Sequence, residues 1–193
     1  MIRIATNADV PAILAIYTPY VTDTTITFEY DVPTLEEFCT RFRTVTERFP
    51  WLVWEEDGEI LGYAYACLPF ERAAYRWCAE PSIYLKPEVK GRGIGKKLYL
   101  ALEEILKLQG CQILLALVTG ENTASVRFHE KLGYHMAGEL KCSGYKLGRW
   151  CSVFWMEKHI NFVENPTEFP TLWCRIRQDD QKICDILYNL SLS

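Results

Sequence analysis

The sequence predicts a mixed α/β fold with antiparallel strands in its first half. Apolar residues alternate with a period of two in some segments and recur at helical spacing in others. Asp57 and Gly58 separate two of the alternating segments and are a strong turn pair for a hairpin. The chain has 193 residues, 49% of them hydrophobic, so it can bury one sizeable core. We therefore expect one principal globular domain.

The first elements are a strand and two helices. Residues 2–6 alternate like a strand, and Asp9 is expected to cap the helix that follows. Thr34 and Glu37 have the spacing of a capping box for a second helix over residues 35–49.

A hairpin and a further strand come next. Residues 51–56 and 59–69 flank the Asp-Gly turn, and residues 74–85 are rich enough in aromatic and β-branched side chains for another strand. Pro81 lies inside that strand and implies a bulge or a gap in the ladder, because proline has no N–H to donate.

The remaining elements alternate between helix and strand. Leu98, Leu102, Ile105 and Leu106 mark the buried stripe of a helix behind a glycine-rich turn. Residues 111–118 suit a strand buried on both faces. Asn122 is placed to cap a helix over residues 122–133, and residues 134–141 and 151–159 are predicted as a final pair of strands.

The pattern of apolar residues changes near residue 160, where the regular periodicity of strands and helices is lost. We expect a main domain over residues 1–160 and an extension over 161–193, which begins as a proline-containing linker. Ile183, Ile186, Leu187 and Leu190 then have the spacing of a short amphipathic helix. Two interpretations are open for it: docking on its own domain or on a second subunit, and a regulatory or partner-binding tail.

Composition excludes several classes of protein. The net charge of −4 and the pI near 5.5 argue against a general binder of nucleic acid or of anionic membranes. The N-terminus has no secretory signal pattern and no segment is apolar enough to span a bilayer, so a cytoplasmic location is expected. The eight cysteines are scattered and are expected to be free thiols. No metal site is expected.

Residues 90–97 predict an anion site. Gly91, Gly93 and Gly95 precede the helix, and Lys90, Arg92, Lys96 and Lys97 surround them. A helix N-terminus carries unpaired N–H groups and a partial positive charge, and glycines allow a ligand to approach that backbone. The charge suits a diphosphate or triphosphate better than a carboxylate.

Two common phosphate motifs fail on spacing. A Walker loop requires Gly-Lys-Ser/Thr, whereas Gly95-Lys96 is followed by Lys97, and no glycine stands at position 90. A dinucleotide fingerprint requires G-x-G-x-x-G after the first strand of a parallel unit, whereas this turn reads G-x-G-x-G and follows a hairpin and a fourth strand.

The turn resembles the pyrophosphate-binding motif Q/R-x-x-G-x-G/A of GNAT-type N-acetyltransferases. "KGRGIG" at 90–95 matches it, with Lys90 where the family usually has glutamine or arginine, and "NTASVRFHEKLGY" is similar to a second family helix. The resemblance covers residues 2 to about 160. It implies the GNAT fold: a mixed, mostly antiparallel sheet of six or seven strands with splayed fourth and fifth strands, flanked by about four helices. It also implies acetyl-CoA as co-substrate and a homodimer.

A narrower resemblance is to the phosphinothricin acetyltransferase branch. It rests on residues 74–95, on "GYKLGRW" at 144–150 and on "TITFEYDVPTLEEF" at 25–38. A histidine often follows "GRW" in that branch, whereas Cys151 stands here, and a branch lysine is replaced by Phe70. The last 30 or so residues match no known pattern.

The resemblance implies roles for individual residues. Glu80 matches the glutamate proposed as general base, with a solvent-facing strand carboxylate as the alternative. His129 stands where many GNAT enzymes have a tyrosine near the CoA sulfur; it is expected to protonate the thiolate or to hydrogen-bond the cofactor, with a packed histidine as the alternative. The backbone N–H of Leu85 or a close neighbour is the expected oxyanion donor. Cofactor contacts are expected from Ile83, Tyr84, Leu85, Lys90, Gly91, Arg92, Gly93, Ile94, Gly95, Lys96, Asn122 and Ser125.

Acceptor recognition is predicted from arginines and aromatic residues. A guanidinium fork can bind a carboxylate or a phosphinate with two hydrogen bonds. The candidate acceptor-binding residues are Phe28, Tyr30, Arg72, Tyr75 and Arg149.

The sequence therefore predicts an acetyl-CoA-dependent N-acetyltransferase of a small amino acid such as phosphinothricin or methionine sulfoximine, acting by direct transfer in a ternary complex. Two alternatives stay open. One is acetylation of a protein N-terminus or lysine, and the other is a noncatalytic acyl-CoA-binding sensor.

Overall fold

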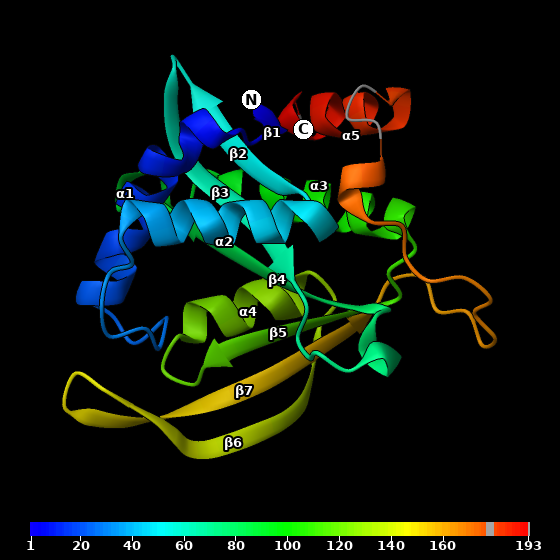
Figure 1. Ribbon diagram of the computed structural model, residues 1–193. Helices are drawn as coiled ribbons and strands as arrows, with labels where there is room; N and C mark the ends of the chain where they lie inside the picture. Colours follow the sequence, from blue (N-terminus) through cyan, green and yellow to red (C-terminus); the bar gives the residue numbers. More distant parts are fainter. Residues whose placement is uncertain (177–179, 193) are drawn as a thin grey trace.

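The computed structural model describes residues 1–176 and 180–192 (Figure 1). It forms a seven-stranded sheet in the order β1-β2-β3-β4-β5-β7-β6. Neighbouring strands are antiparallel except for β4 and β5, which are parallel. The strands are β1 (Ile2–Ile4), β2 (Trp51–Glu56), β3 (Glu59–Cys67), β4 (Cys78–Leu85), β5 (Ile113–Thr119), β6 (His135–Lys146) and β7 (Arg149–His159).

Helices cover both faces of this sheet. The helices are α1 (Val10–Thr22), α2 (Leu35–Arg48), α3 (Ile94–Gln109), α4 (Thr123–Lys131) and α5 (Gln181–Leu192). The first two pack on one face, and α3 packs on the other (Figure 1). The two faces are called the α1/α2 face and the α3 face below.

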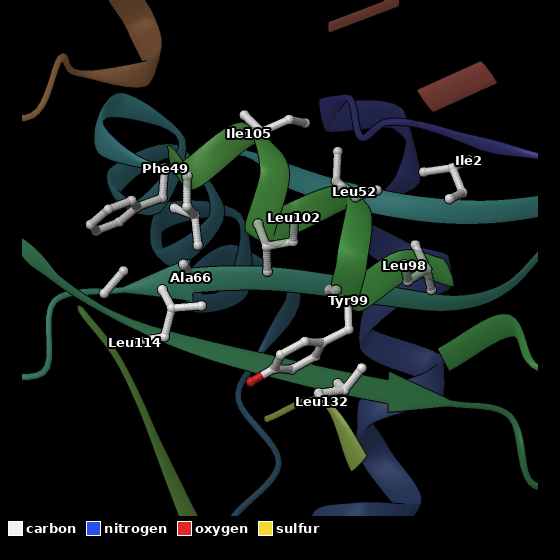
Figure 2. Packing of buried hydrophobic residues seen from close by; sticks show 14 of the residues in the cluster. Ile2, Phe49, Leu52, Ala66, Leu98, Tyr99, Leu102, Ile105, Leu114 and Leu132 are labelled. Atoms are coloured by element: carbon white, nitrogen blue, oxygen red, sulfur yellow. The ribbon is translucent and has the colours of Figure 1, made fainter. Parts of the chain in front are cut away.

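Each face has its own core. On the α3 face, the four predicted residues Leu98, Leu102, Ile105 and Leu106 are all completely buried, and Figure 2 shows the first three of them along the helix. Helix α3 packs on β2, β3 and β4. Burying each such side chain stabilises the fold by about 1.5–3 kcal/mol. The core of the α1/α2 face is aromatic, with Trp51 stacked on Tyr65 at a centroid distance of 4.2 Å. The α3 stripe is confirmed.

The predicted turn and one predicted cap are confirmed. Asp57 and Gly58 both have positive φ, 50° and 79°, as the tight β2–β3 hairpin requires. Thr34 accepts from the N–H of Glu37, whose carboxylate accepts from the N–H of Thr34, which closes the capping box of α2.

The predicted cap at Asp9 is wrong. Its carboxylate accepts from the backbone N–H of Thr6 at 2.7 Å and binds Arg3 with two hydrogen bonds of 2.7 and 2.8 Å. The Arg3 guanidinium holds the pKa of Asp9 below its usual range. Two hydrogen bonds to a guanidinium bind the carboxylate more strongly than one backbone N–H of a cap, so the side chain turns back toward β1.

Strands β4 and β5 separate at Pro81. They pair only at Cys78 with Ile113 and at Ala79 with Leu114. Gln112 N–H donates to Trp77 O on the β5 side, whereas Lys86 N–H donates to Leu61 O of β3. Because the direction of backbone groups alternates along a strand, the odd-numbered residues of β4 face β5. Pro81 meets β5 without an N–H, so the ladder stops there, while the register with β3 continues unbroken. The gap is as predicted, and no bulge forms.

Two predicted strand boundaries are wrong. Residues Ala73–Tyr75 form a 3₁₀ turn, so β4 begins only at Cys78. At the other end of the chain β6 and β7 extend through residues expected to be a loop, and the hairpin closes at Leu147 and Gly148, both with positive φ. Alternation is hard to see in β6 because most of its side chains are exposed.

The C-terminal segment packs on its own chain. Trp173 and Ile183 are each 1% exposed and belong to the α3-face core. Helix α5 lies against α3 and β1, where Ser191 Oγ accepts from the N–H of Ile2 at 2.7 Å (Figure 1). Within the described ranges, no helix has the length and apolar character needed to cross a bilayer.

Candidate active site

A cavity of about 510 Å³ opens where β4 and β5 separate. Its wall includes residues from both faces of the sheet, so it is a slot through the sheet and is called the slot below. The lining residues are Tyr20, Ile26, Pro81, Ser82, Ile83, Tyr84, Leu85, Lys90, Gly91, Gly93, Gly95, Lys96, Ala116, Leu117, Val118, Thr119, Asn122, Ala124, Ser125, Phe128 and His129.

The glycine turn forms one end of the slot. Gly91 and Gly93 have φ of 85° and 81°, a conformation that other residues adopt only with strain. Gly93 is the N-cap of α3, and the first four N–H groups of a helix have no partner within it. A Cβ at Gly95 would lie 3.2 Å from Leu85 Cδ1, so glycine there allows α3 to approach β4 closely.

The predicted cations of this turn point in different directions. Lys96 lines the slot, and Lys90 Nζ lies 5.2 Å from the centre of the Tyr20 ring, at the slot wall. Arg92 is turned away and binds Glu56 with two hydrogen bonds of 3.0 and 2.7 Å. Ile94 is 2% exposed and packs in the α3-face core. Of these residues, Lys90 and Lys96 add positive charge at the slot, whereas Arg92 does not.

The open edge of β4 supplies further backbone groups. Ile83 and Leu85 are odd-numbered, so their backbone groups face the gap that β5 leaves. Leu85 N–H donates to the Tyr20 hydroxyl over a long 3.4 Å, and that hydroxyl donates to Leu85 O at 2.6 Å. Tyr84 packs its ring edge-on against Tyr17 on the α1/α2 face.

Helix α4 presents Asn122, Ser125 and His129. Asn122 caps the helix by accepting from the N–H of Ser125 at 3.1 Å. His129 is 4% exposed; its Nδ1 lies 2.8 Å from Ser125 O and its Nε2 lies 3.1 Å from the Tyr99 hydroxyl. A carbonyl only accepts, so the neutral ring carries its proton on Nδ1. Burial lowers the pKa of His129, which keeps the ring neutral at pH 7.

Thr119 is a wall residue that the sequence did not indicate. Its hydroxyl is buried, and among the described residues it has no hydrogen-bond partner. Buried hydroxyls are normally paired, so this orphan in the slot wall points to a ligand that supplies the partner. Tyr20 and Phe128 also line the slot unpredicted. The one sequence signal that could have identified Thr119 is its position as a polar residue at the end of a buried strand.

Glu80 lies on the α1/α2 face of β4, beside the slot. Ser82, the next residue on that face, lines the slot, and Cys67 is the partner of Glu80 on β3. Burial raises the pKa of the Glu80 carboxyl. Burial, together with the nearby Glu80 carboxylate, raises the pKa of the Cys67 thiol to about 12, so Cys67 stays protonated.

The candidate acceptor residues fall into two groups. Phe28, Tyr30 and Arg149 lie together: Tyr30 donates to Tyr145 O near the closed end of the β6–β7 hairpin, and Arg149 pairs with Glu121 at 2.9 Å. Arg72 and Tyr75 lie in the β3–β4 connection, whose Phe70 ring stacks on Trp155 of β7 with a centroid distance of 5.6 Å. Figure 1 shows the β3–β4 connection and the closed end of the β6–β7 hairpin on opposite sides of the molecule.

The sequence model of the acetyltransferase (GNAT) domain matches residues 2–155. The chain belongs to the GNAT acetyltransferase family. The predicted family and fold are therefore confirmed, including the splayed fourth and fifth strands.

Curated relatives of this GNAT acetyltransferase include phosphinothricin and methionine sulfoximine acetyltransferases. A phosphinothricin N-acetyltransferase of Alcaligenes faecalis is 38% identical over 164 residues, which cover 83% of this chain and 82% of the relative. An L-methionine sulfoximine/L-methionine sulfone acetyltransferase of Pseudomonas aeruginosa is 35% identical and is covered to 94%, with 83% of this chain matched.

Solved structures agree with this placement. A GNAT superfamily phosphinothricin acetyltransferase of Sinorhizobium meliloti, in complex with AcCoA, superposes with a TM-score of 0.82 at 35% identity. The match covers 89% of this GNAT chain and 92% of that one. The resemblance to the phosphinothricin acetyltransferase branch is confirmed.

Proposed function

We propose that this protein transfers the acetyl group of acetyl-CoA to the amino group of a small amino acid such as phosphinothricin, methionine sulfoximine or a related compound. The transfer is direct, within a ternary complex. One observation carries the proposal: the slot passes through the sheet, with the glycine turn on the α3 side and Glu80 beside it on the α1/α2 side. The names of the relatives support the choice of acceptor.

The donor end fits acetyl-CoA. Bound there, acetyl-CoA supplies an acetyl group activated as a thioester. The N–H groups at the start of α3 hold its pyrophosphate, with Lys96 adding charge. The backbone edge at Ile83 and Leu85 is placed to pair with the amide-bearing arm, and the unpartnered Thr119 hydroxyl offers one more hydrogen bond.

Glu80 is the proposed general base. An amino-acid ammonium group has a pKa of roughly 9–10 in water, so a base has to remove its proton before it can attack near pH 7. Burial makes the Glu80 carboxylate a stronger base than an exposed one, because its pKa is raised. A positioned base contributes about 10²- to 10⁴-fold to the rate.

Leu85 and His129 have supporting roles in this proposal. Leu85 N–H makes only a long bond to Tyr20, so it is available to stabilise the developing oxyanion. Both nitrogens of His129 are already hydrogen-bonded, so we assign it a hydrogen-bonding role near the thiol end, in which it orients Ser125 at the slot wall. Phe28, Tyr30 and Arg149 are proposed to border the acceptor from the side of the α1–α2 loop. Arg72 and Tyr75, in the β3–β4 connection, are proposed to approach it from the side of Glu80.

A panel assay tests the proposal. The protein is incubated with acetyl-CoA and with phosphinothricin, methionine sulfoximine or methionine sulfone, and thiol release is measured. We expect turnover on at least one of them. Saturable acetyl-CoA binding without turnover on the panel would overturn the amino-acid hypothesis. Turnover of a peptide amine would then favour a protein acetyltransferase, and its absence a sensor.

Glu80→Gln tests the base assignment. We expect kcat/KM to fall by about 10²- to 10⁴-fold near pH 7, with acetyl-CoA affinity retained. The loss should shrink at high pH, where the amine is already neutral, and at low pH, where Glu80 of the unmodified enzyme is itself protonated. The folded protein holds the Glu80 proton to higher pH than the unfolded chain, so ionisation of Glu80 costs stability as pH rises through its pKa. The Glu80→Gln variant should therefore be at least as stable as the unmodified protein at pH 7.

Glu71→Gln, at an exposed glutamate, is the control. Loss of cofactor binding in the Glu80 variant would contradict the assignment.

A homodimeric state and a cytoplasmic location stay predictions. Gel filtration with light scattering would test the first, and fractionation of cells that express the protein would test the second.

A further inference from the structure

Lys146 is a buried cation beside the loop that joins α1 and α2. It is the last residue of β6 and is 2% exposed. Its Nζ donates to Thr27 O at 2.8 Å, and among the described residues it forms no salt bridge. An ammonium group has three donors, and buried charges in proteins are normally paired. The charge of Lys146 is therefore only partly satisfied.

A second cation reaches the same loop from α2. Arg41 Nη2 pairs with Glu29 Oε1 at 2.7 Å, and both side chains are about one-third exposed. The guanidinium lies 5.3 Å from the centre of the Phe38 ring and 6.0 Å from that of Tyr17, which fixes its position over the aromatic core. Lys146, Arg41 and Glu29 together carry two positive charges and one negative charge, so one positive charge is in excess.

This cluster adjoins the acceptor side of the slot. Thr27, which binds Lys146, follows Ile26, a slot residue. Tyr17 hydrogen-bonds the Thr27 hydroxyl at 2.8 Å and packs on Tyr84, another slot residue.

We propose that Lys146 and Arg41 form a subsite for an anionic group of the acceptor, with Glu29 occupying the place of that group while the acceptor is absent. The inference rests on the proposed function, because it takes the acceptor to be an amino acid. Two cations and a partly exposed carboxylate match an exchange of one anion for another, in which Arg41 keeps an anionic partner and the displaced Glu29 turns to solvent. Burial lowers the pKa of Lys146, and the carboxylate of Glu29 opposes that effect, so Lys146 also interacts electrostatically with Glu29.

A purely structural role would have a different signature. If Lys146 only holds the loop in place through Thr27 O, its replacement lowers kcat/KM equally for every acceptor. If Lys146 binds an anion, its replacement lowers kcat/KM only for acceptors that carry a negative charge. The discriminating pair is therefore methionine sulfone and its carboxamide, which differ in the negative charge.

The experiment compares Lys146→Met, Arg41→Met and Glu29→Gln with the unmodified enzyme. Lys141→Met is the matched control, since Lys141 is an exposed lysine on the same strand. We expect Lys146→Met to lower kcat/KM for methionine sulfone by about 10- to 100-fold, mostly through KM, as for a lost hydrogen bond to a charged group. Turnover of the carboxamide should change by less than about threefold, which also shows that the variant is folded. Glu29→Gln should lower KM for the charged acceptor.

The outcomes separate the two proposals. Equal loss with both acceptors, or no loss with either, would overturn the subsite and leave the proposed function standing. Absence of turnover by the unmodified enzyme on every amino acid of the panel would overturn the proposed function and the subsite with it.

Discussion

The two sides of the slot are built by different means. On the α3 side, one continuous turn supplies backbone N–H groups, and Gly91, Gly93 and Gly95 keep that backbone accessible. On the α1/α2 side, the wall is made of side chains: Tyr20 of α1, Ile26 of the α1–α2 loop, and Ser82 and Tyr84 of β4. Behind it, the α1–α2 loop is bound by Lys146 and Arg41.

This difference predicts which substitutions alter each side of the slot. A backbone site is altered by changes in conformation and hardly at all by exchange of exposed side chains, as Arg92 illustrates by facing Glu56. A side-chain site is altered by changes in charge or in loop position. The predictions below test this contrast in order of decreasing effect.

Gly93→Ala should cause the largest loss, on the donor side. An added Cβ meets nothing within 4 Å, so the penalty comes from φ of +81°. A non-glycine residue in that conformation is strained by about 1–2 kcal/mol. If the turn relaxes in the free protein and has to regain this conformation on binding, acetyl-CoA affinity falls by about 5- to 30-fold. Equilibrium binding of acetyl-CoA measures it.

Gly58→Ala is the matched control for that change. Gly58 has φ of +79° and equally open surroundings, but it lies in the β2–β3 turn. It should lose similar stability and keep its acetyl-CoA affinity. If both variants bound acetyl-CoA equally well, the backbone account of the donor side would fail.

Gly144→Ala should act on the acceptor side alone. Its Cβ would lie 2.3 Å from the Phe28 ring, so that ring, which belongs to the α1–α2 loop, has to move. Displacing a substrate wall by even about 1 Å lowers kcat/KM for the acceptor by about tenfold or more. Steady-state kinetics with each substrate varied in turn would show it. The control is Gly138→Ala on the same strand, where an added Cβ meets nothing within 4 Å. A change in acetyl-CoA affinity in the Gly144 variant would contradict the separation of the two sides.

Glu121→Gln should have the smallest effect. Glu121 holds Arg149, and its carboxylate also accepts from the Thr25 hydroxyl at 3.3 Å. The ion pair is largely exposed, so its loss should change acceptor kcat/KM by about threefold or less, and the difference should shrink as salt is added. Kinetics at two ionic strengths would measure it. A large effect that salt does not alter would mean that Arg149 binds the acceptor directly.

Much of the fold could be predicted because its signals are local. The capping box at Thr34 and the hairpin turn at Asp57 each depend on two nearby residues and were confirmed. The Asp9 cap failed because Arg3 competes for the carboxylate, and the hairpin strands were predicted too short because β6 buries few side chains. Thr119 could not be identified, since its lack of a partner exists only once the slot is formed.

The sequence by itself determined the family and the donor turn, because a glycine pattern before an amphipathic helix specifies a local backbone conformation. Pro81 likewise marked the strand where the sheet opens. Only the tertiary structure decided which side chains form the acceptor side. It turned Arg92 away from the slot, and it brought Lys146 to Thr27 and Arg41 to Glu29. The physical reason is that these partners are distant in sequence, so their contacts depend on packing that no local pattern encodes.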